Sequence, residues 1–115
     1  ILDRAYSALI DDLSDRGMLD DTLLIAMGEF GRTPKISNRA AREHHKDCYF
    51  SIWAGGGIEP GRVIGESDAK AEHPITRPIT PLQVGTTIAE LCGIGARKRA
   101  EMKVLDGGSV IHELI

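Results

Sequence analysis

The first apolar positions along the chain recur at steps of four, three and four residues, the spacing of one face of an α-helix. These positions are Leu2, Tyr6, Leu9 and Leu13. Gly17 marks the end of this helix, and a polar turn then leads into the continuous apolar run "LLIAM", residues 23–27. A short run of this kind is typical of a strand covered on both faces, so the start of the chain predicts a helix followed by a buried strand.

The next stretch, from Gly28 to Asp47, is polar and predicts a long loop with at most one helical turn. Loops of this length inside a compact domain are usually functional or disordered. "CYFSIWA", residues 48–54, returns to strand composition and is closed by three glycines. Residues 58–80 are interrupted by glycine and proline and therefore predict another loop.

A capping signal marks the start of a second helix. Thr80 is suited to the N-cap, Pro81 to the first helical position, and Gln83 completes a capping box. Gly93 marks the end of this helix. The tail from Lys103 onward predicts one or two short strands around a glycine turn.

Helices that alternate with apolar strands predict an α/β fold with a mainly parallel sheet. Two core strands alone would leave open sheet edges and one poorly covered face. The chain also begins without an initiator Met and inside a predicted helix. We therefore expect residues 1–115 to be a single partial domain, the C-terminal portion of a larger one.

Composition narrows the functional classes. The 115 residues are 42% hydrophobic and 27% charged, as in an ordinary soluble domain. The net charge of −3 and the scattered basic residues argue against nucleic acid or an anionic membrane as a partner. No apolar run approaches the roughly 20 residues of a membrane helix. Cys48 and Cys92 belong to no CxxC pair, which predicts two unpaired, buried thiols.

The loop "MGEFGRTP", residues 27–34, follows directly on the first strand, in the position where α/β sheets bind ligands. A carboxylate held on a tight turn, here Glu29, can ligate a metal ion or transfer a proton. A helix-capping or salt-bridged carboxylate is the alternative. Arg32 and Lys35 in the same loop are side chains of the kind that bind oxyanions, although exposed loop cations are common.

The segment "REHHKDC", residues 42–48, combines two adjacent histidines with carboxylates on either side, the side chains from which divalent metal sites are built. In extended backbone, His44 and His45 point in opposite directions, so at most one of them reaches a given metal. The other histidine could orient a carboxylate or contact substrate. A solvated charged loop is the alternative.

The remaining candidates are weaker. His73 and His112 are single histidines without evident partners. "AGGGIEPG" lacks the G-x-G-x-x-G pattern and the Walker lysine, and therefore predicts a turn at a strand end. The chain also lacks a G-x-S-x-G elbow.

Four blocks in this order, "GEFGRTPKI", "REHH", "WAGGGIEPGRVIGESD" and "RPITPLQVGTTIAELCGI", resemble the C-terminal part of the domain-of-unknown-function 1501 family, which is often labelled sulfatase-like, within the alkaline phosphatase superfamily. The resemblance covers nearly the whole chain. It implies an α/β, alkaline-phosphatase-like three-layer sandwich with a mainly parallel central sheet, of which this chain is the C-terminal fragment. It also implies metal-assisted hydrolysis of sulfate or phosphate esters, with the nucleophile in the N-terminal half.

Carried onto this sequence, the strand-end Asp-His pair of the superfamily falls on Glu29, with Phe30 in place of the histidine. The Asp-His dipeptide common in the family falls on Glu43 and His44. The resemblance therefore implies Glu29 and His44 as ligands of a divalent metal ion, whether zinc, calcium or another. Further residues would orient these ligands or contact substrate; they are Glu43, His45, Arg32 and Lys35.

The resemblance also sets the expected partners, which are a small-molecule or glycan ester substrate and the N-terminal remainder of the same protein. It implies a bacterial-type exported or periplasmic protein, and we expect the fragment alone to be inactive. The replacements at Phe30 and Glu43 leave a second function class open. In that alternative, the chain is a non-catalytic binding or scaffolding module that retains the fold.

Overall fold

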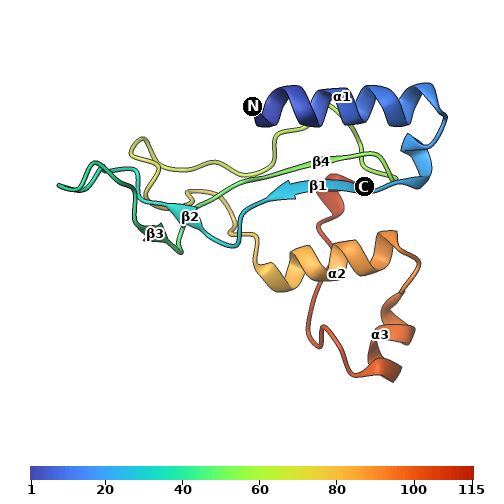
Figure 1. Ribbon diagram of the computed structural model, residues 1–115. Helices are drawn as coiled ribbons and strands as arrows, with labels where there is room; N and C mark the ends of the chain where they lie inside the picture. Colours follow the sequence, from blue (N-terminus) through green and yellow to red (C-terminus); the bar gives the residue numbers. More distant parts are fainter. The chain divides into compact units, whose positions relative to one another are not determined.

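The computed structural model describes residues 1–115, which form two compact units. The first unit contains Ile1–Ile25, Trp53–Arg62 and Thr80–Ile115, and the second contains Ala26–Ile52 and Val63–Ile79. Figure 1 shows the order of the elements along the chain. The single partial domain and the three-layer sandwich with a mainly parallel sheet remain predictions.

In the first unit, helix α1 (Leu2–Asp15) confirms the predicted amphipathic helix. Its apolar face is held by Leu13, which is buried, and by Tyr6, whose hydroxyl donates a hydrogen bond to the carbonyl oxygen of Leu24 at 3.1 Å. The short 3₁₀ helix η1 (Leu19–Asp21) then leads the chain toward the first strand.

The two predicted apolar strands are present and pair with each other. Strand β1 (Leu24–Met27) and strand β4 (Ser51–Ala54) form a two-stranded sheet, visible in Figure 1. After β4 the chain turns at Gly55, where φ is +67° and an added Cβ atom would lie 2.3 Å from the carbonyl oxygen of Thr22. Only glycine fits this close approach.

Helix α2 (Pro81–Leu91) confirms the predicted second helix and its start. Thr80 accepts a hydrogen bond from the backbone N–H of Gln83, and the side chain of Gln83 accepts one from the backbone N–H of Thr80, which completes the capping box. The buried face of α2 carries Thr86 and Thr87, which are both fully buried. These two positions take no part in the capping signal by which the helix is identified in the sequence.

The predicted strands in the C-terminal tail were wrong. The chain forms helix α3 (Ala96–Met102) and a 3₁₀ turn, η2 (His112–Leu114), and the tail contains no strand. The backbone N–H of Ile111 bonds to the hydroxyl of Thr87 at 2.9 Å instead of to a neighbouring strand. The buried residue of α3 is Arg99, whose guanidinium donates a hydrogen bond to the carboxylate of Glu90 at 2.5 Å.

The second unit contains the stretch predicted as a long loop, and most of it is without regular structure, but two short strands that were not predicted lie within it. Strand β2 (Gly31–Arg32) and strand β3 (His44–His45) pair antiparallel. A second hairpin-like segment is closed by a bridge between Ser67 and Pro74. Main-chain pairing of this kind leaves little trace in the side-chain pattern, because the strands are two residues long.

Two further predictions concern the thiols and the membrane. Both cysteines are free, as expected, but the prediction that both are buried was wrong, because Cys92 is exposed and Cys48 is half-buried. No helix in the structure has the length and apolar character needed to cross a bilayer.

Candidate functional site

Glu29 lies in the bend between β1 and β2, two residues beyond the end of β1. Its side chain is exposed and forms no hydrogen bond or ion pair within the described chain. The helix-capping or salt-bridged carboxylate, the alternative raised by the sequence, is therefore not what the structure shows. The carboxylate of Glu29 is free to bind an external ligand.

Beyond Glu29 the backbone forms a hairpin, in which β2 pairs with β3. Gly31 is paired with His45, and Arg32 with His44. Thr33 continues this register, because its N–H donates to the carbonyl oxygen of Glu43 at 2.9 Å and its hydroxyl accepts from the N–H of Glu43 at 3.0 Å. The hairpin therefore has at least three successive cross-strand residue pairs.

The side chain of Arg42 links the two sides of the hairpin. Its guanidinium donates hydrogen bonds to the carbonyl oxygen of Thr33, at 2.7 Å, and to that of Pro34 on the facing strand. Nearer the tip, the N–H of Ser37 donates to the carbonyl oxygen of Ala41 at 2.8 Å. These contacts order a segment whose composition gives it no apolar core.

His44 and His45 point to opposite faces of the hairpin, as the extended-backbone argument predicts. The ring of His44 is exposed and lies against Phe30, with 3.9 Å between ring centroids. The ring of His45 is half-buried, and its Nε2 atom lies 2.7 Å from the carbonyl oxygen of Glu72. This contact places a proton on Nε2 of His45 and attaches β3 to the segment around Glu72.

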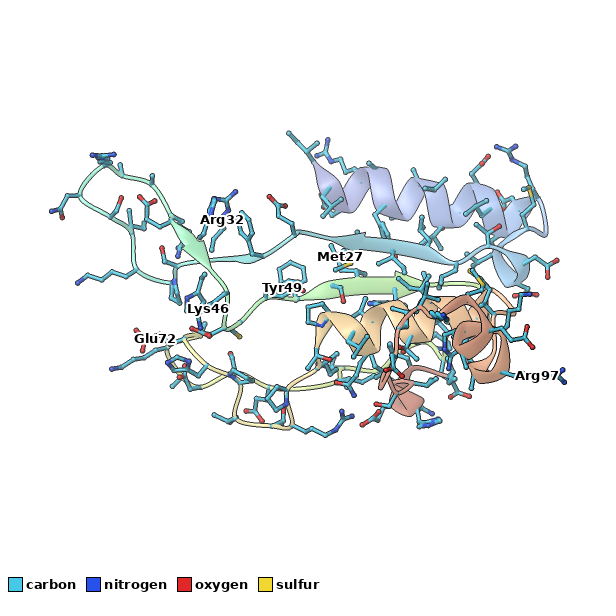
Figure 2. All side chains as sticks on the ribbon, turned by 90° about the horizontal axis from the view of Figure 1, so that it is seen from below. Met27, Arg32, Lys46, Tyr49, Glu72 and Arg97 are labelled. Carbon is cyan, nitrogen blue, oxygen red and sulfur yellow. The ribbon has the colours of Figure 1, made fainter.

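Arg32 is brought onto the same face as His44, directly opposite it in the strand pair. Its guanidinium carbon lies 5.3 Å from the centroid of the Phe30 ring, within the range of a cation–π contact. Phe30 thus lies against both His44 and Arg32. Figure 2 shows Arg32 on this hairpin.

The structure does not bring the other predicted residues into a common site with His44. Lys35 is exposed toward the tip of the hairpin, where its carbonyl oxygen accepts a bond from Thr33. Glu43 is exposed and contributes only backbone hydrogen bonds to the hairpin. His45 lies on the opposite face from His44 and is engaged by Glu72.

His73 is not the lone histidine that the sequence indicates. Its ring lies 6.4 Å from that of His45, measured between centroids. Its backbone N–H donates to the carboxylate of Asp68, which also accepts hydrogen bonds from the N–H groups of Glu72 and Lys70. Sequence reasoning missed Asp68, although an acidic residue before a short polar turn is the usual signal for such a turn.

Two carboxylates in this unit have lowered pKa values. The backbone hydrogen bond from Glu72, with those from Lys70 and His73, holds the pKa of Asp68 below its ordinary value. The hydrogen bond from Lys46, at 2.6 Å, lowers the pKa of Asp47. In both cases, hydrogen bonds from neighbouring residues stabilise the ionised form of the side chain.

Glu29 and His44 have unoccupied donor atoms, but two side chains are fewer than a metal site generally uses. Glu29 offers carboxylate oxygens, and neither ring nitrogen of His44 has a hydrogen-bond partner in the described chain. No three His, Cys, Asp or Glu side chains of residues 1–115 are grouped to hold one ion. Metal sites in enzymes generally use three or more protein ligands, so Glu29 and His44 do not by themselves complete such a set.

Comparison with known protein families shows the family to which the chain belongs. The family model described as "Protein of unknown function (DUF1501)" matches residues 1–115, and the chain therefore belongs to this family. Neither a curated protein nor a solved structure matches the chain.

Proposed function

We propose that this chain is the metal-site portion of a hydrolase that acts on sulfate or phosphate esters. The observation that carries the proposal is the arrangement of Glu29, Phe30 and His44 at the end of β1. A free carboxylate directly precedes a phenyl ring that lies against a free, exposed imidazole. The resemblance of the four sequence blocks to sulfatase-like proteins supports this proposal.

A divalent ion bound by Glu29 and His44 would polarise the ester and stabilise charge on the displaced oxygen. Phe30 positions the ligand, because its ring lies 3.9 Å from that of His44 and limits the rotation of the imidazole. His45 fixes the backbone next to His44 through its hydrogen bond to Glu72. The ligand is thereby held on a paired strand, which keeps it in place before the metal binds.

Arg32 supplies the oxyanion contact. It faces His44 across the strand pair, and its guanidinium has the planar set of donors that matches a tetrahedral sulfate or phosphate group. The stacking on Phe30 restrains the arginine without neutralising it. An ester oxygen at the metal and a second oxygen at Arg32 would then be bound from the same face of the hairpin.

The second candidate function is a non-catalytic binding module. It is favoured by the position of Phe30, which occupies the place of a potential histidine ligand and covers one face of His44. In that case the exposed face of the hairpin would recognise a partner without a metal ion.

Metal content and ester hydrolysis separate these two functions. The full-length protein would be analysed for bound metal and for hydrolysis of 4-nitrophenyl sulfate and 4-nitrophenyl phosphate, alongside the variants Glu29→Gln and His44→Gln. Matched controls are Glu66→Gln and His112→Gln, which change an exposed carboxylate and an exposed imidazole outside the site.

The proposal expects bound metal and activity in the unaltered protein and in both controls, and at least a tenfold loss of each in Glu29→Gln and His44→Gln. If the two site variants keep the metal content and activity of the controls, these residues are not the ligands. A protein that binds no metal and hydrolyses neither ester would instead favour the binding module.

A further inference from the structure

The carboxylate of Asp68 orders the short loop of residues 68–73 from within. Its Oδ1 atom accepts hydrogen bonds from the N–H groups of Lys70, at 3.0 Å, and Glu72, at 2.9 Å, and its Oδ2 atom accepts one from the N–H of His73 at 3.2 Å. The N–H of Asp68 also donates to the carbonyl oxygen of His73 at 2.9 Å. One half-buried side chain therefore binds three backbone N–H groups of this loop.

Ala71, within the loop, has a backbone conformation that alanine seldom adopts. Its φ is +56°, in the left-handed region. The N–H of Ala71 donates to the carbonyl oxygen of Asp68 at 2.9 Å, and the N–H of the next residue, Glu72, is bound by the carboxylate of Asp68. A residue is kept in such a conformation by the contacts around it. We therefore expect the loop to relax when the carboxylate is removed.

One peptide group of this loop binds both Asp68 and strand β3. The N–H of His73 and the carbonyl group of Glu72 belong to the same planar peptide group. Its N–H donates to Asp68, and its carbonyl oxygen lies 2.7 Å from Nε2 of His45. Figure 2 labels Glu72 on this loop. The hydrogen bond to Asp68 therefore fixes the direction in which the carbonyl group of Glu72 points toward His45.

His45 transmits this support to His44, because the two histidines are successive residues of β3 with side chains on opposite faces. A two-stranded hairpin is only marginally stable by itself. The contact with Glu72 holds β3 from the face opposite to His44. If that contact is lost, β3 is free to rotate about its axis, which moves the imidazole of His44 away from Phe30.

We propose that Asp68 is a positioning residue for His44 and acts through the backbone of Glu72 and the side chain of His45. This inference rests on the proposed function, in which His44 binds the metal ion. It adds to that site a residue that touches neither the metal nor the substrate. Residues that orient a metal ligand from outside typically change metal affinity about 10–100-fold when they are replaced.

The test measures the position of His44 and the affinity for Zn²⁺ in the full-length protein. The ring hydrogens of His44 should show a ring-current shift in the NMR spectrum, because the ring centroid lies 3.9 Å from that of Phe30. This measurement is made before Zn²⁺ is added and therefore reports position alone. The affinity is then measured by competition with a chelator of known affinity, since imidazole and carboxylate groups are ligands of Zn²⁺.

Three variants separate positioning from a general loss of order. Asp68→Ala removes all three hydrogen bonds of the carboxylate, and Asp68→Asn keeps one acceptor oxygen. Thr76→Val is the matched control, because the hydroxyl of Thr76 accepts a hydrogen bond from the N–H of Glu66, at 3.0 Å, just outside the loop. This control removes a backbone-binding oxygen from the same part of the second unit and leaves Asp68 intact.

We expect Asp68→Ala to reduce the ring-current shift of His44 and to weaken Zn²⁺ binding about tenfold or more. Asp68→Asn should give intermediate values of both, and Thr76→Val should match the unaltered protein. An unchanged ring-current shift or an unchanged Zn²⁺ affinity in Asp68→Ala would overturn the inference. Equal effects in Asp68→Ala and Thr76→Val would also overturn it, as would an Asp68→Asn variant that resembles Asp68→Ala in both measurements.

Failure of the proposed function gives a different result. In that case the unaltered protein binds no Zn²⁺, or it binds Zn²⁺ equally well after His44→Gln, and the inference about Asp68 is overturned together with the function. Zn²⁺ binding that requires His44 but is insensitive to Asp68→Ala would leave the proposed function in place and overturn the inference alone.

Discussion

Replacing Thr87 by valine is expected to destabilise the first unit by detaching the C-terminal segment from α2. The side chain of Thr87 is fully buried. Its hydroxyl donates to the carbonyl oxygen of Gln83 at 2.8 Å and accepts from the N–H of Ile111 at 2.9 Å. Valine has nearly the same shape, so the substitution removes these two hydrogen bonds and leaves the packing volume almost unchanged.

The loss of these two hydrogen bonds has different effects on the free energy of unfolding. Gln83 lies inside a helix, where its carbonyl oxygen retains the backbone hydrogen bond of the turn, so losing the hydroxyl there costs little. The N–H of Ile111 is buried and would be left without a partner, which costs about 1–3 kcal/mol. This magnitude is a large fraction of the stability of a small protein unit.

Thr86 provides the control, because it is also fully buried and its hydroxyl donates only to the carbonyl oxygen of Leu82, at 2.8 Å. Thr86→Val removes the helix-internal bond alone and should cost less than about 1 kcal/mol for that bond. The added methyl group would lie beside Gly108, so this control overstates the cost of the lost bond. Thr87→Ser keeps the hydroxyl and should restore most of the lost stability.

Urea unfolding of the four proteins, followed by circular dichroism, measures these differences in the free energy of unfolding. The slope of that free energy against urea concentration should be the same in each, because the surface exposed on unfolding does not change. A Thr87→Val variant as stable as the unaltered protein, or a Thr87→Ser variant as unstable as Thr87→Val, would refute the role of the bond to Ile111.

Three further predictions concern single contacts. Gly31→Ala would place a Cβ atom 2.1 Å from the carbonyl oxygen of Cys48 and should destabilise the second unit by about 1–3 kcal/mol, measured by thermal unfolding; an unchanged melting temperature would contradict it. Thr80→Ala removes one half of the capping box of α2 and should cost about 1 kcal/mol in urea unfolding, with no loss expected if the cap is unimportant. Asp68 has a lowered pKa in the folded state, so its contribution to stability is present above its ordinary pKa near 4 and is lost as the pH falls through the lower folded value. An NMR titration should show the amide signal of Glu72 shifting only in that acidic range and no longer titrating in Asp68→Asn.

The sequence alone determined the elements that depend on neighbouring residues. The apolar spacing of α1, the capping box at Thr80 and the apolar runs of β1 and β4 are short-range patterns, and each predicted an element that the structure contains. The family was also identified from ordered local blocks, and the match over residues 1–115 confirms it. Placement of Glu29 beyond the end of β1 follows from the same local pattern.

Tertiary structure decided which of the candidate residues meet. The pairing of Arg32 with His44 joins positions twelve residues apart through main-chain hydrogen bonds, which any side chains could accompany. That pairing places Phe30 against His44 and directs His45 toward Glu72. The contact between Thr87 and Ile111 is likewise invisible in the sequence, because a hydroxyl that satisfies a distant backbone N–H leaves no periodic signal. The sequence therefore determined the local elements, while the long-range hydrogen bonds of the folded backbone determined the composition of the candidate site.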